Sequence, residues 1–271
     1  MKDWGDDMVI TIGGISPHPP LLIPEIGGSE RLKVKKTDDS LNILAEKILK
    51  EGVETIIFMS PHSPYIRDGI TIFSGDTLYG DFSQFGESRV KFKYENDLEI
   101  VELLIQSGRK YGIKFYKLPQ NYPLDHGILV PLYYLDKLKD YDFKIVGMSQ
   151  HFTLDKENHI VFKQIFDDIE IFEKKVAFIA SGDMSHRLLS YGPYGYHPSG
   201  PKFDNLVVEA IKNENFDDLI SIPDDLIEEA GECGYRSILT LFTLMPFEKY
   251  KAEVLSYEGP FGVGYLVAVV E

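Results

Sequence analysis

A tripeptide motif that occurs twice places histidines where a metal site could form. Ser-Pro-His occurs at residues 16–18 and again at residues 60–62, each time after an apolar run typical of a strand buried on both faces. Because proline cannot continue a central strand, each histidine is expected just past a strand's carboxyl end, where open α/β sheets bind ligands. Neutral imidazole is the commonest nitrogen ligand of metals in proteins. We therefore predict that His18 and His62 share one metal ion, against the alternative of two unrelated loop histidines.

A third ligand would complete this site, and two adjacent residues could supply it. Two histidines and one carboxylate with open coordination positions form the non-haem Fe(II) arrangement. Glu232 enters a predicted apolar helix among small residues, where an unpaired carboxylate would be costly. Its alternative role is that of an ordinary first-turn acid near the helix dipole. Cys233, the only cysteine, could instead be a thiolate ligand or a small core residue. A glutamate ligand favours iron, whereas a cysteine ligand favours zinc, copper or another thiolate-bound metal.

Two further histidines could move protons or contact a substrate. His186 follows a third buried strand, and we predict that it is a general acid/base. The alternative is that this segment only caps a helix. Asp183 could hydrogen-bond a neighbouring imidazole and so fix its tautomer. His126 opens an apolar helix, where a buried structural role and a substrate-contacting role fit the sequence equally well.

The elements that must position these residues alternate between strands and helices. Strands are predicted at residues 8–14, 55–60, 70–73, 90–94, 113–118, 143–148, 175–181, 252–257 and 264–270. Helices are predicted at residues 29–50, 97–108, 128–138, 154–172, 203–212, 217–229 and 235–245, and residues 75–86 are expected to be irregular. This order predicts an α/β fold with a mostly parallel sheet, helices on both faces and antiparallel edge strands at the end. We expect a single domain over residues 1–271, with residues 1–7 as a disordered start.

The composition excludes several kinds of partner. The net charge of −15 argues against nucleic acid and against anionic membranes. No apolar run approaches the roughly 20 residues that span a bilayer, and the N-terminus lacks an apolar signal core, so we expect a cytoplasmic protein. The single cysteine excludes an internal disulfide and a cysteine-rich zinc site. The glycine-rich segments match neither a dinucleotide-binding nor a phosphate-loop motif, and a serine hydrolase is disfavoured because no nucleophile elbow is present.

Several motifs, taken in order, resemble one known family. They are ISPHPPLLIPEIG, MSPHSPY, GDFSQFG, LDHGILVPLYYL, FIASGDMSH, GPYGYHPSGPKFD, ECGYRS and LSYEGPFGVGY. From Val9 to Val270 the chain resembles class III extradiol ring-cleavage dioxygenases of the catalytic-subunit-B (LigB-like) superfamily. It is most similar to the branch associated with AmmeMemoRadiSam, and we expect it to lack the extra C-terminal domain that this branch often carries. The resemblance implies a three-layer α/β/α sandwich.

The resemblance also implies a ligand set. Members of the family that are dioxygenases bind Fe(II), and their motifs place the metal ligands at His18, His62 and Glu232, with Zn²⁺ or another divalent metal as the alternative. The family's acid/base histidine falls on His186, and a second active-site histidine falls on His126. A related Memo-type branch, not established as ring-cleaving, has a cysteine before a glycine at the third position, which here is Cys233.

The expected function is cleavage of a catechol-type aromatic ring with O₂. One alternative is a metal-binding accessory or interaction protein of a radical-SAM-associated system, with AmmeMemoRadiSam proteins as partners and no ring cleavage. Another is metal-assisted hydrolysis, in which Zn²⁺ activates a water and His186 is the base. Formation of a homo-oligomer is compatible with the fold, although no segment of the sequence indicates it.

Overall fold

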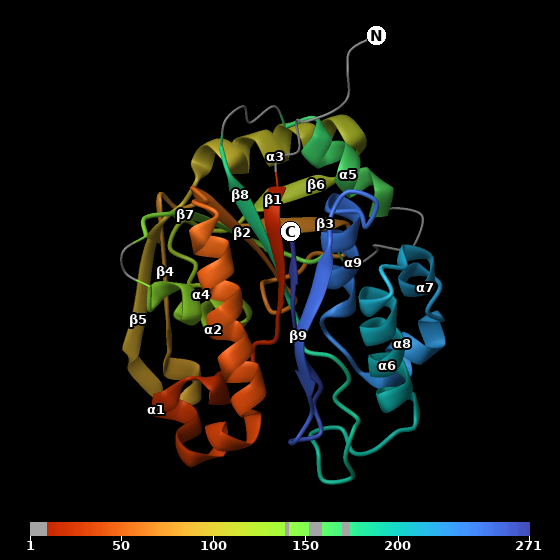
Figure 1. Ribbon diagram of the computed structural model, residues 1–271. Helices are drawn as coiled ribbons and strands as arrows, with labels where there is room; N and C mark the ends of the chain where they lie inside the picture. The colour runs from red at the N-terminus through yellow and green to blue at the C-terminus, as the bar shows by residue number, and fades with distance from the viewer. Residues whose placement is uncertain (1–9, 139–140, 152–158, 170–173) are drawn as a thin grey trace.

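An eight-stranded sheet forms the centre of the molecule (Figure 1). The computed structural model describes residues 10–138, 141–151, 159–169 and 174–271. Within these ranges the strand order is β6-β3-β7-β2-β8-β1-β10-β9. The four central strands run parallel to one another, and they are β7 (Lys144–Ser149), β2 (Thr55–Ser60), β8 (Val176–Ser181) and β1 (Ile10–Ser16).

Antiparallel strands border this parallel core on both sides. β10 (Tyr265–Val270) pairs antiparallel with β1, and β9 (Ala252–Glu258) pairs antiparallel with β10, which confirms the predicted edge. At the other edge, β3 (Gly69–Ile72) pairs antiparallel with β7, and β6 (Lys114–Lys117) runs parallel to β3. The sequence did not predict this second change of direction.

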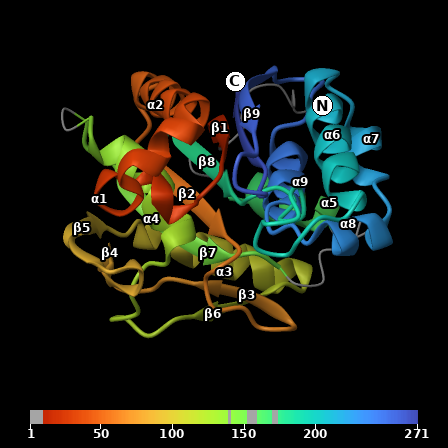
Figure 2. The ribbon, with the colours of Figure 1, turned by 90° about the horizontal axis from the view of Figure 1, so that it is seen from below.

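Helices cover both faces of the sheet, so the chain forms the predicted three-layer sandwich (Figures 1 and 2). Along β2, Ile56 and Phe58 pack into one buried cluster, whereas Ile57 and Met59 pack into the other. The first cluster lies beneath α2 (Lys35–Lys50) and α4 (His126–Asp136). The second lies beneath α3 (Leu98–Tyr111), α5 (His159–Asp167) and α9 (Tyr235–Leu244). The remaining helices are α1 (Pro24–Gly27), α6 (Ser199–Lys212), α7 (Phe216–Ile220) and α8 (Asp224–Ala230).

The segment at residues 75–86, expected to be irregular, instead forms part of a hairpin. β4 (Thr77–Phe82) pairs antiparallel with β5 (Glu87–Glu95) in a separate two-stranded sheet. Leu78, Gly80 and Phe82 are buried in alternation, but the glycine and the intervening polar residues obscure this pattern in the sequence. A 3-10 turn and Gly86, with φ of +81°, close the hairpin.

Other differences concern the ends of elements. The helix predicted from residue 29 begins as a 3-10 turn over Gly28–Val34 before α2 starts. The first strand extends to Ser16, two residues beyond its predicted end. The described residues do not include residues 1–9. They also do not include two parts of the predicted helix 154–172, which are residues 154–158 and 170–172. No helix in the described ranges has both the length and the apolar character needed to cross a membrane.

Candidate metal centre

The carboxyl ends of three parallel strands bring two histidines into contact. β1 ends at Ser16 and β8 at Ser181, and these two residues are paired in register. β2, on the other side of β8, ends at Ser60. The loops that follow β1 and β2 place His18 Nε2 and His62 Nε2 2.9 Å apart. The sheet topology therefore brings together the two residues predicted to share a metal.

Cys233 supplies the third donor atom at this point. Its Sγ lies 3.7 Å from His18 Nε2, and the donor atoms of His18, His62 and Cys233 all lie within 4.8 Å of one another. The thiol also accepts a hydrogen bond from the backbone N–H of Asp183 at 3.2 Å. Among the described residues, this is the group of histidine, cysteine and acidic side chains whose geometry could hold a metal ion.

A close backbone approach sets the position of Cys233. The N–H groups of Cys233 and Gly234 both donate to the carbonyl of Asp183, at 3.2 and 2.9 Å. A Cβ at Gly182 would lie 2.0 Å from the Cα of Gly234, so a side chain there would force the two segments apart. The glycine pair therefore allows the loop before α9 to reach the end of β8.

The Glu232 carboxylate has a different partner in this structure. It accepts a hydrogen bond from the backbone N–H of Tyr235 at 2.5 Å, in the first turn of α9. Burial raises the pKa of Glu232 to about 7, although the Tyr235 N–H acts in the opposite direction. The carboxylate lies outside the three-residue group, and Glu232 itself precedes α9 rather than standing in its first turn.

Ser181 fixes the tautomer of His18, a role that the sequence did not reveal. The Ser181 hydroxyl donates to the Gly127 carbonyl at 2.5 Å and lies 2.9 Å from His18 Nδ1. A hydroxyl has one proton, and here Gly127 receives it, so Ser181 must accept a proton from His18 Nδ1. The lone pair of His18 is therefore on Nε2, the atom that faces His62 and Cys233.

Asp125 joins the His62 loop to the start of α4. Its carboxylate accepts hydrogen bonds from the hydroxyls of Ser60 and Ser63, both at 2.6 Å, and from the Gly127 N–H at 2.8 Å. The His62 N–H in turn donates to Ser60 Oγ at 3.1 Å. A Cβ at Gly127 would lie 2.2 Å from Ser60 Oγ, so only glycine fits at this position. The sequence marked Asp125 only as the residue before a helix-opening histidine.

The two other predicted histidines lie beside this group. The His126 ring centroid is 4.0 Å from that of His62 and 5.3 Å from that of His18. The ring of His186 stacks on Tyr194, with centroids 5.3 Å apart. In the described structure, His186 Nδ1 is buried and has no hydrogen-bond partner. No helix directly follows β8, so the alternative of a helix-capping segment around His186 is wrong.

The four imidazoles are held in their neutral form. Burial lowers the pKa of His18 well below its usual value, and His62, His126 and His186 lower it further. Burial also lowers the pKa values of His62 and His186, and burial together with His62 lowers that of His126 to about 3. Neutral imidazoles present the lone pairs that a metal or a proton would need.

Asp183 binds a backbone group rather than an imidazole. Its Oδ1 accepts a hydrogen bond from the backbone N–H of His18 at 2.9 Å. The predicted contact of Asp183 with an imidazole ring is replaced by that of Ser181, because Ser181 ends β8 directly opposite the end of β1. Asp183 thus fixes the His18 backbone, and Ser181 fixes its ring.

Comparisons with known proteins relate the whole chain to one family. The sequence matches the family described as the catalytic LigB subunit of aromatic ring-opening dioxygenase over residues 14–268. Protein CA_C1420 of Clostridium acetobutylicum is 35% identical over 265 residues, covering 94% of this chain and 56% of that protein. This chain thus spans little more than half the length of that relative. The 3,4-dihydroxyphenylacetate 2,3-dioxygenase of Escherichia coli is 23% identical over 257 residues, covering 89% of this chain and 92% of the enzyme.

A solved structure shows the same fold. The crystal structure of the uncharacterized protein JW3007 from Escherichia coli K12 matches with a TM-score of 0.61 and 13% sequence identity. The match covers 96% of this chain and 98% of that one. On the strength of the sequence match over residues 14–268, the chain belongs to the family of the catalytic LigB subunit of aromatic ring-opening dioxygenases.

Proposed function

We propose that this protein is a metal-dependent dioxygenase that opens the ring of a catechol-type aromatic diol with O₂. The observation that carries the proposal is the convergence of neutral histidines at one edge of the sheet. His18 and His62 face each other through Nε2, and His126 lies beside both. The family match supports this reaction class, as does the similarity to an enzyme named as a dioxygenase of a dihydroxyphenyl acid.

The donor set fits a divalent metal. His18 and His62 would hold Fe(II), with Zn²⁺ or another divalent ion as the alternative. The Cys233 thiol is close enough to the two histidines to serve as the third ligand, whereas Glu232, the ligand expected for iron, would have to leave the Tyr235 N–H to bind. When Fe(II) is bound with open coordination positions, it supplies a common contact for the diol and O₂ and a path for electron transfer between them.

The remaining histidines of the site would handle protons and orientation. His186 is neutral, and its buried Nδ1 has no partner within the described structure, so the ring can accept a proton from a diol hydroxyl and later return it. His126 is neutral because of burial and His62, and would hydrogen-bond the oxygen atoms of the reactants. Asp183 and Ser181 hold His18 still while this happens. The ring bond beside the diol breaks and both atoms of O₂ enter the product, a semialdehyde.

Oxygen uptake tests this proposal. The protein would be purified anaerobically, loaded with Fe(II) and mixed with a panel of catechols in an oxygen electrode, while the absorbance of a ring-opened product is followed. We expect uptake with at least one catechol. His186→Gln should lower turnover by about 10²–10⁴-fold while the metal stays bound. His197→Gln, in the loop at residues 182–198 and outside the candidate metal centre, is the matched control and should keep full activity. Uptake that is absent, or unchanged in His186→Gln, would contradict the proposal.

The position of Cys233 favours a second candidate function. A thiolate ligand suits zinc or copper better than it suits the two-histidine, one-carboxylate iron arrangement. The protein would then be a metal-binding accessory or interaction protein of a radical-SAM-associated system, with AmmeMemoRadiSam proteins as partners. With Zn²⁺, the same residues could instead activate a water, with His186 as the base.

Metal content separates the two candidates. One equivalent of iron together with oxygen uptake supports the dioxygenase. One equivalent of zinc or copper with no uptake on any catechol, and a stable complex with a partner protein, supports the accessory function.

A further inference from the structure

Tyr194 stacks on His186, the residue to which the proposed function assigns proton transfer. The two ring centroids lie 5.3 Å apart and the ring planes are inclined by 27°, an offset stack of the kind that aromatic pairs prefer. Tyr194 lies in the loop between β8 and α6 and is 60% exposed, so its ring adds little to the buried core. Core packing therefore does not account for an aromatic residue at this position.

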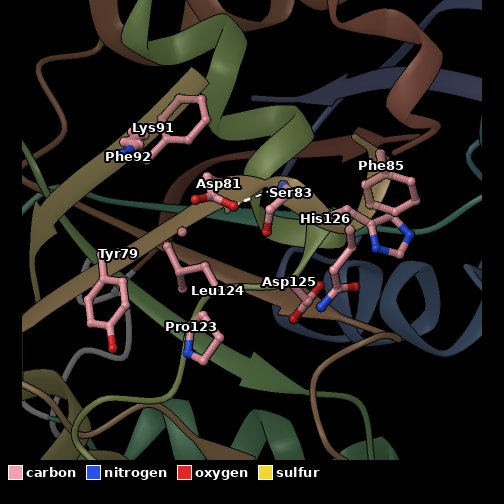
Figure 3. Close-up of a pocket in the computed structure, with 12 residues that line it drawn as sticks. Tyr79, Asp81, Ser83, Phe85, Lys91, Phe92, Pro123, Leu124, Asp125 and His126 are labelled. Carbon is pink, nitrogen blue, oxygen red and sulfur yellow. Dashed lines mark hydrogen bonds between the residues drawn. The ribbon is translucent and has the colours of Figure 1, made fainter. Parts of the chain in front are cut away.

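The imidazole of His186 has fewer supports than that of His126. Phe85 meets the His126 ring edge to face, with centroids 5.0 Å apart, as Figure 3 shows, and the His62 ring lies 4.0 Å away. Among the described ring contacts, His186 has Tyr194 alone. A functional histidine is usually oriented by a hydrogen bond at its second nitrogen, but His186 Nδ1 has no such partner in the described structure. Packing against Tyr194 takes over that role.

Gly231, at the end of α8, makes room for the Tyr194 ring. It adopts a φ of +61°, and a Cβ there would lie 3.1 Å from Cδ2 of Tyr194. The His186 N–H donates to the carbonyl of the preceding residue, Ala230, at 3.3 Å. Burial lowers the pKa of His186, and the backbone of Gly231 acts in the opposite direction. The same short segment thus lies against both members of the stack.

Backbone hydrogen bonds hold Tyr194 in place. The Gly195 N–H closes a tight turn over residues 192–195 at 3.2 Å, and Gly195 adopts a φ of +71°. Just beyond this turn, the His197 N–H donates to the Arg187 carbonyl at 3.1 Å. Arg187 directly follows the stacked histidine, so the chain after Tyr194 is tied back to the stack.

We propose that Tyr194 is a positioning residue for His186, whose imidazole it holds in the orientation that exchanges a proton with a diol hydroxyl. The inference rests on the proposed function, which makes His186 the acid/base. The ring of Tyr194, rather than its hydroxyl, makes the contact. Small displacements of a reacting group cost much of the rate. Loss of the stack should therefore slow the chemical step and leave binding of the diol at the metal largely unchanged.

The mobility of the His186 ring tests this positioning without relying on turnover. The protein would carry ¹³C- and ¹⁵N-labelled histidine and Zn²⁺, which has no redox chemistry, and His186→Gln would identify the His186 signal. We expect the order parameter of the His186 Cε1–H bond to fall from about 0.85 in the wild type to below about 0.6 in Tyr194→Ala. Tyr194→Phe keeps the stack and should keep the wild-type value. Tyr191→Ala, in the same loop and 78% exposed, is the matched control and should also keep it.

Steady-state kinetics of the same variants separate positioning from binding. With the Fe(II)-loaded protein and a catechol that supports oxygen uptake, Tyr194→Ala should lower kcat by about tenfold or more and change KM by less than about threefold. Tyr194→Phe and Tyr191→Ala should retain both constants. Because Tyr194 is largely exposed, the urea midpoint of Tyr194→Ala should match that of the wild type, which shows that the variant is folded.

Three results would overturn the proposal. The first is an order parameter of His186 that does not change in Tyr194→Ala. The second is an equal effect of Tyr194→Ala and Tyr191→Ala on kcat. The third is a loss in Tyr194→Phe as large as that in Tyr194→Ala, which would assign the role to the hydroxyl and not to the stack.

Failure of this inference is distinguishable from failure of the proposed function. If the His186 ring becomes mobile in Tyr194→Ala but the Fe(II)-loaded wild type consumes no oxygen, the positioning by Tyr194 stands and the dioxygenase assignment fails. If oxygen is consumed and Tyr194→Ala changes neither the ring mobility nor kcat, the reverse holds.

Discussion

Pro131 stands four residues after Gly127 in α4 and leaves the Gly127 carbonyl free of the helix. In a regular helix the N–H of residue 131 would donate to this carbonyl, but proline has no N–H. The Ser181 hydroxyl donates to it instead, at 2.5 Å, and is thereby forced to accept a proton from His18 Nδ1. A proline in the middle of a buried helix thus favours the tautomer of His18 that carries its proton on Nδ1 and leaves a lone pair on Nε2, the atom that faces the candidate metal centre.

Ser181→Ala should weaken metal binding without unfolding the protein. The substitution removes the acceptor that holds the Nδ1 proton of His18, and loss of such an orienting group typically costs about 10–100-fold in metal affinity. Competition titration with a chromophoric Zn²⁺ chelator would measure the change. Ser190→Ala, at an exposed loop position, is the control and should bind as tightly as the wild type. Equal affinities for Ser181→Ala and the wild type would mean that the tautomer of His18 is not set by this hydroxyl.

Pro131→Ala should also weaken metal binding, although residue 131 does not belong to the candidate metal centre. The new N–H at residue 131 competes with Ser181 for the Gly127 carbonyl, so the Ser181 hydroxyl becomes free to donate to His18 rather than accept. We expect metal affinity to fall by about threefold or more. Nitrogen-15 chemical shifts of the His18 ring would reveal the change of tautomer directly. If the His18 ring keeps its proton on Nδ1 in this variant, Pro131 does not influence the tautomer of His18 through Ser181.

The third ligand can be assigned by comparing Cys233→Ser with Glu232→Gln. Since the Cys233 thiol already lies with the two histidines, Cys233→Ser should lower metal affinity by about tenfold or more. Glu232→Gln keeps an oxygen that can accept from the Tyr235 N–H and should change affinity by less than about threefold. Metal content after dialysis measures both. If Glu232→Gln loses the metal and Cys233→Ser retains it, Glu232 is the ligand and must turn towards the histidines on binding.

The buried Asp204 should make the stability of the protein depend on pH. Its carboxylate accepts hydrogen bonds from the Ser185 N–H at 2.8 Å and from the Tyr257 hydroxyl at 2.5 Å, and burial raises its pKa to about 6. Because the folded pKa is above the unfolded value of about 4, the contribution of Asp204 is complete below about pH 4 and is lost as the pH rises through about 6. The loss amounts to at most about 3 kcal/mol, at roughly 1.4 kcal/mol per pKa unit.

Asp204→Asn removes this titration and keeps the shape of the side chain. The free energy of unfolding of the variant, relative to that of the wild type, should therefore rise between about pH 4 and pH 7 in urea denaturation. Asp217→Asn, at an exposed position, should show no such trend. A flat difference for Asp204→Asn would show that the carboxyl is not protonated preferentially in the folded state.

The sequence predicted those parts of the site that depend on strand ends. His18 and His62 follow buried parallel strands, and parallel strands deliver their carboxyl ends to one edge, so periodicity and proline sufficed to bring the two together. The placement of Cys233 depends on how closely Gly182 approaches Gly234, which are distant in sequence, and no local pattern encodes that approach. For the same reason, the choice between Glu232 and Cys233 stayed open until their side chains could be located.

The sequence did not predict the hydrogen bonds that Ser181 makes or the strand β4. Ser181 contacts His18 and Gly127 across long separations, and its residue type is common at the ends of strands. β4 was missed because Gly80 occupies a buried position where the alternating pattern needs an apolar residue. A Cβ at Gly80 would lie 3.0 Å from the Leu124 carbonyl, so close contact with the segment before α4 accounts for the glycine.

Oxygen-18 labelling tests the central claim most directly. The Fe(II)-loaded protein would be given an aromatic diol under ¹⁸O₂, and the product would be analysed by mass spectrometry. If His18, His62, His126 and His186 form the centre of a ring-cleaving dioxygenase, both labelled atoms will appear in a ring-opened product. A product that contains no ¹⁸O, or a diol recovered intact with Fe(II) still bound, would contradict the claim and leave the metal site to the accessory or hydrolytic function.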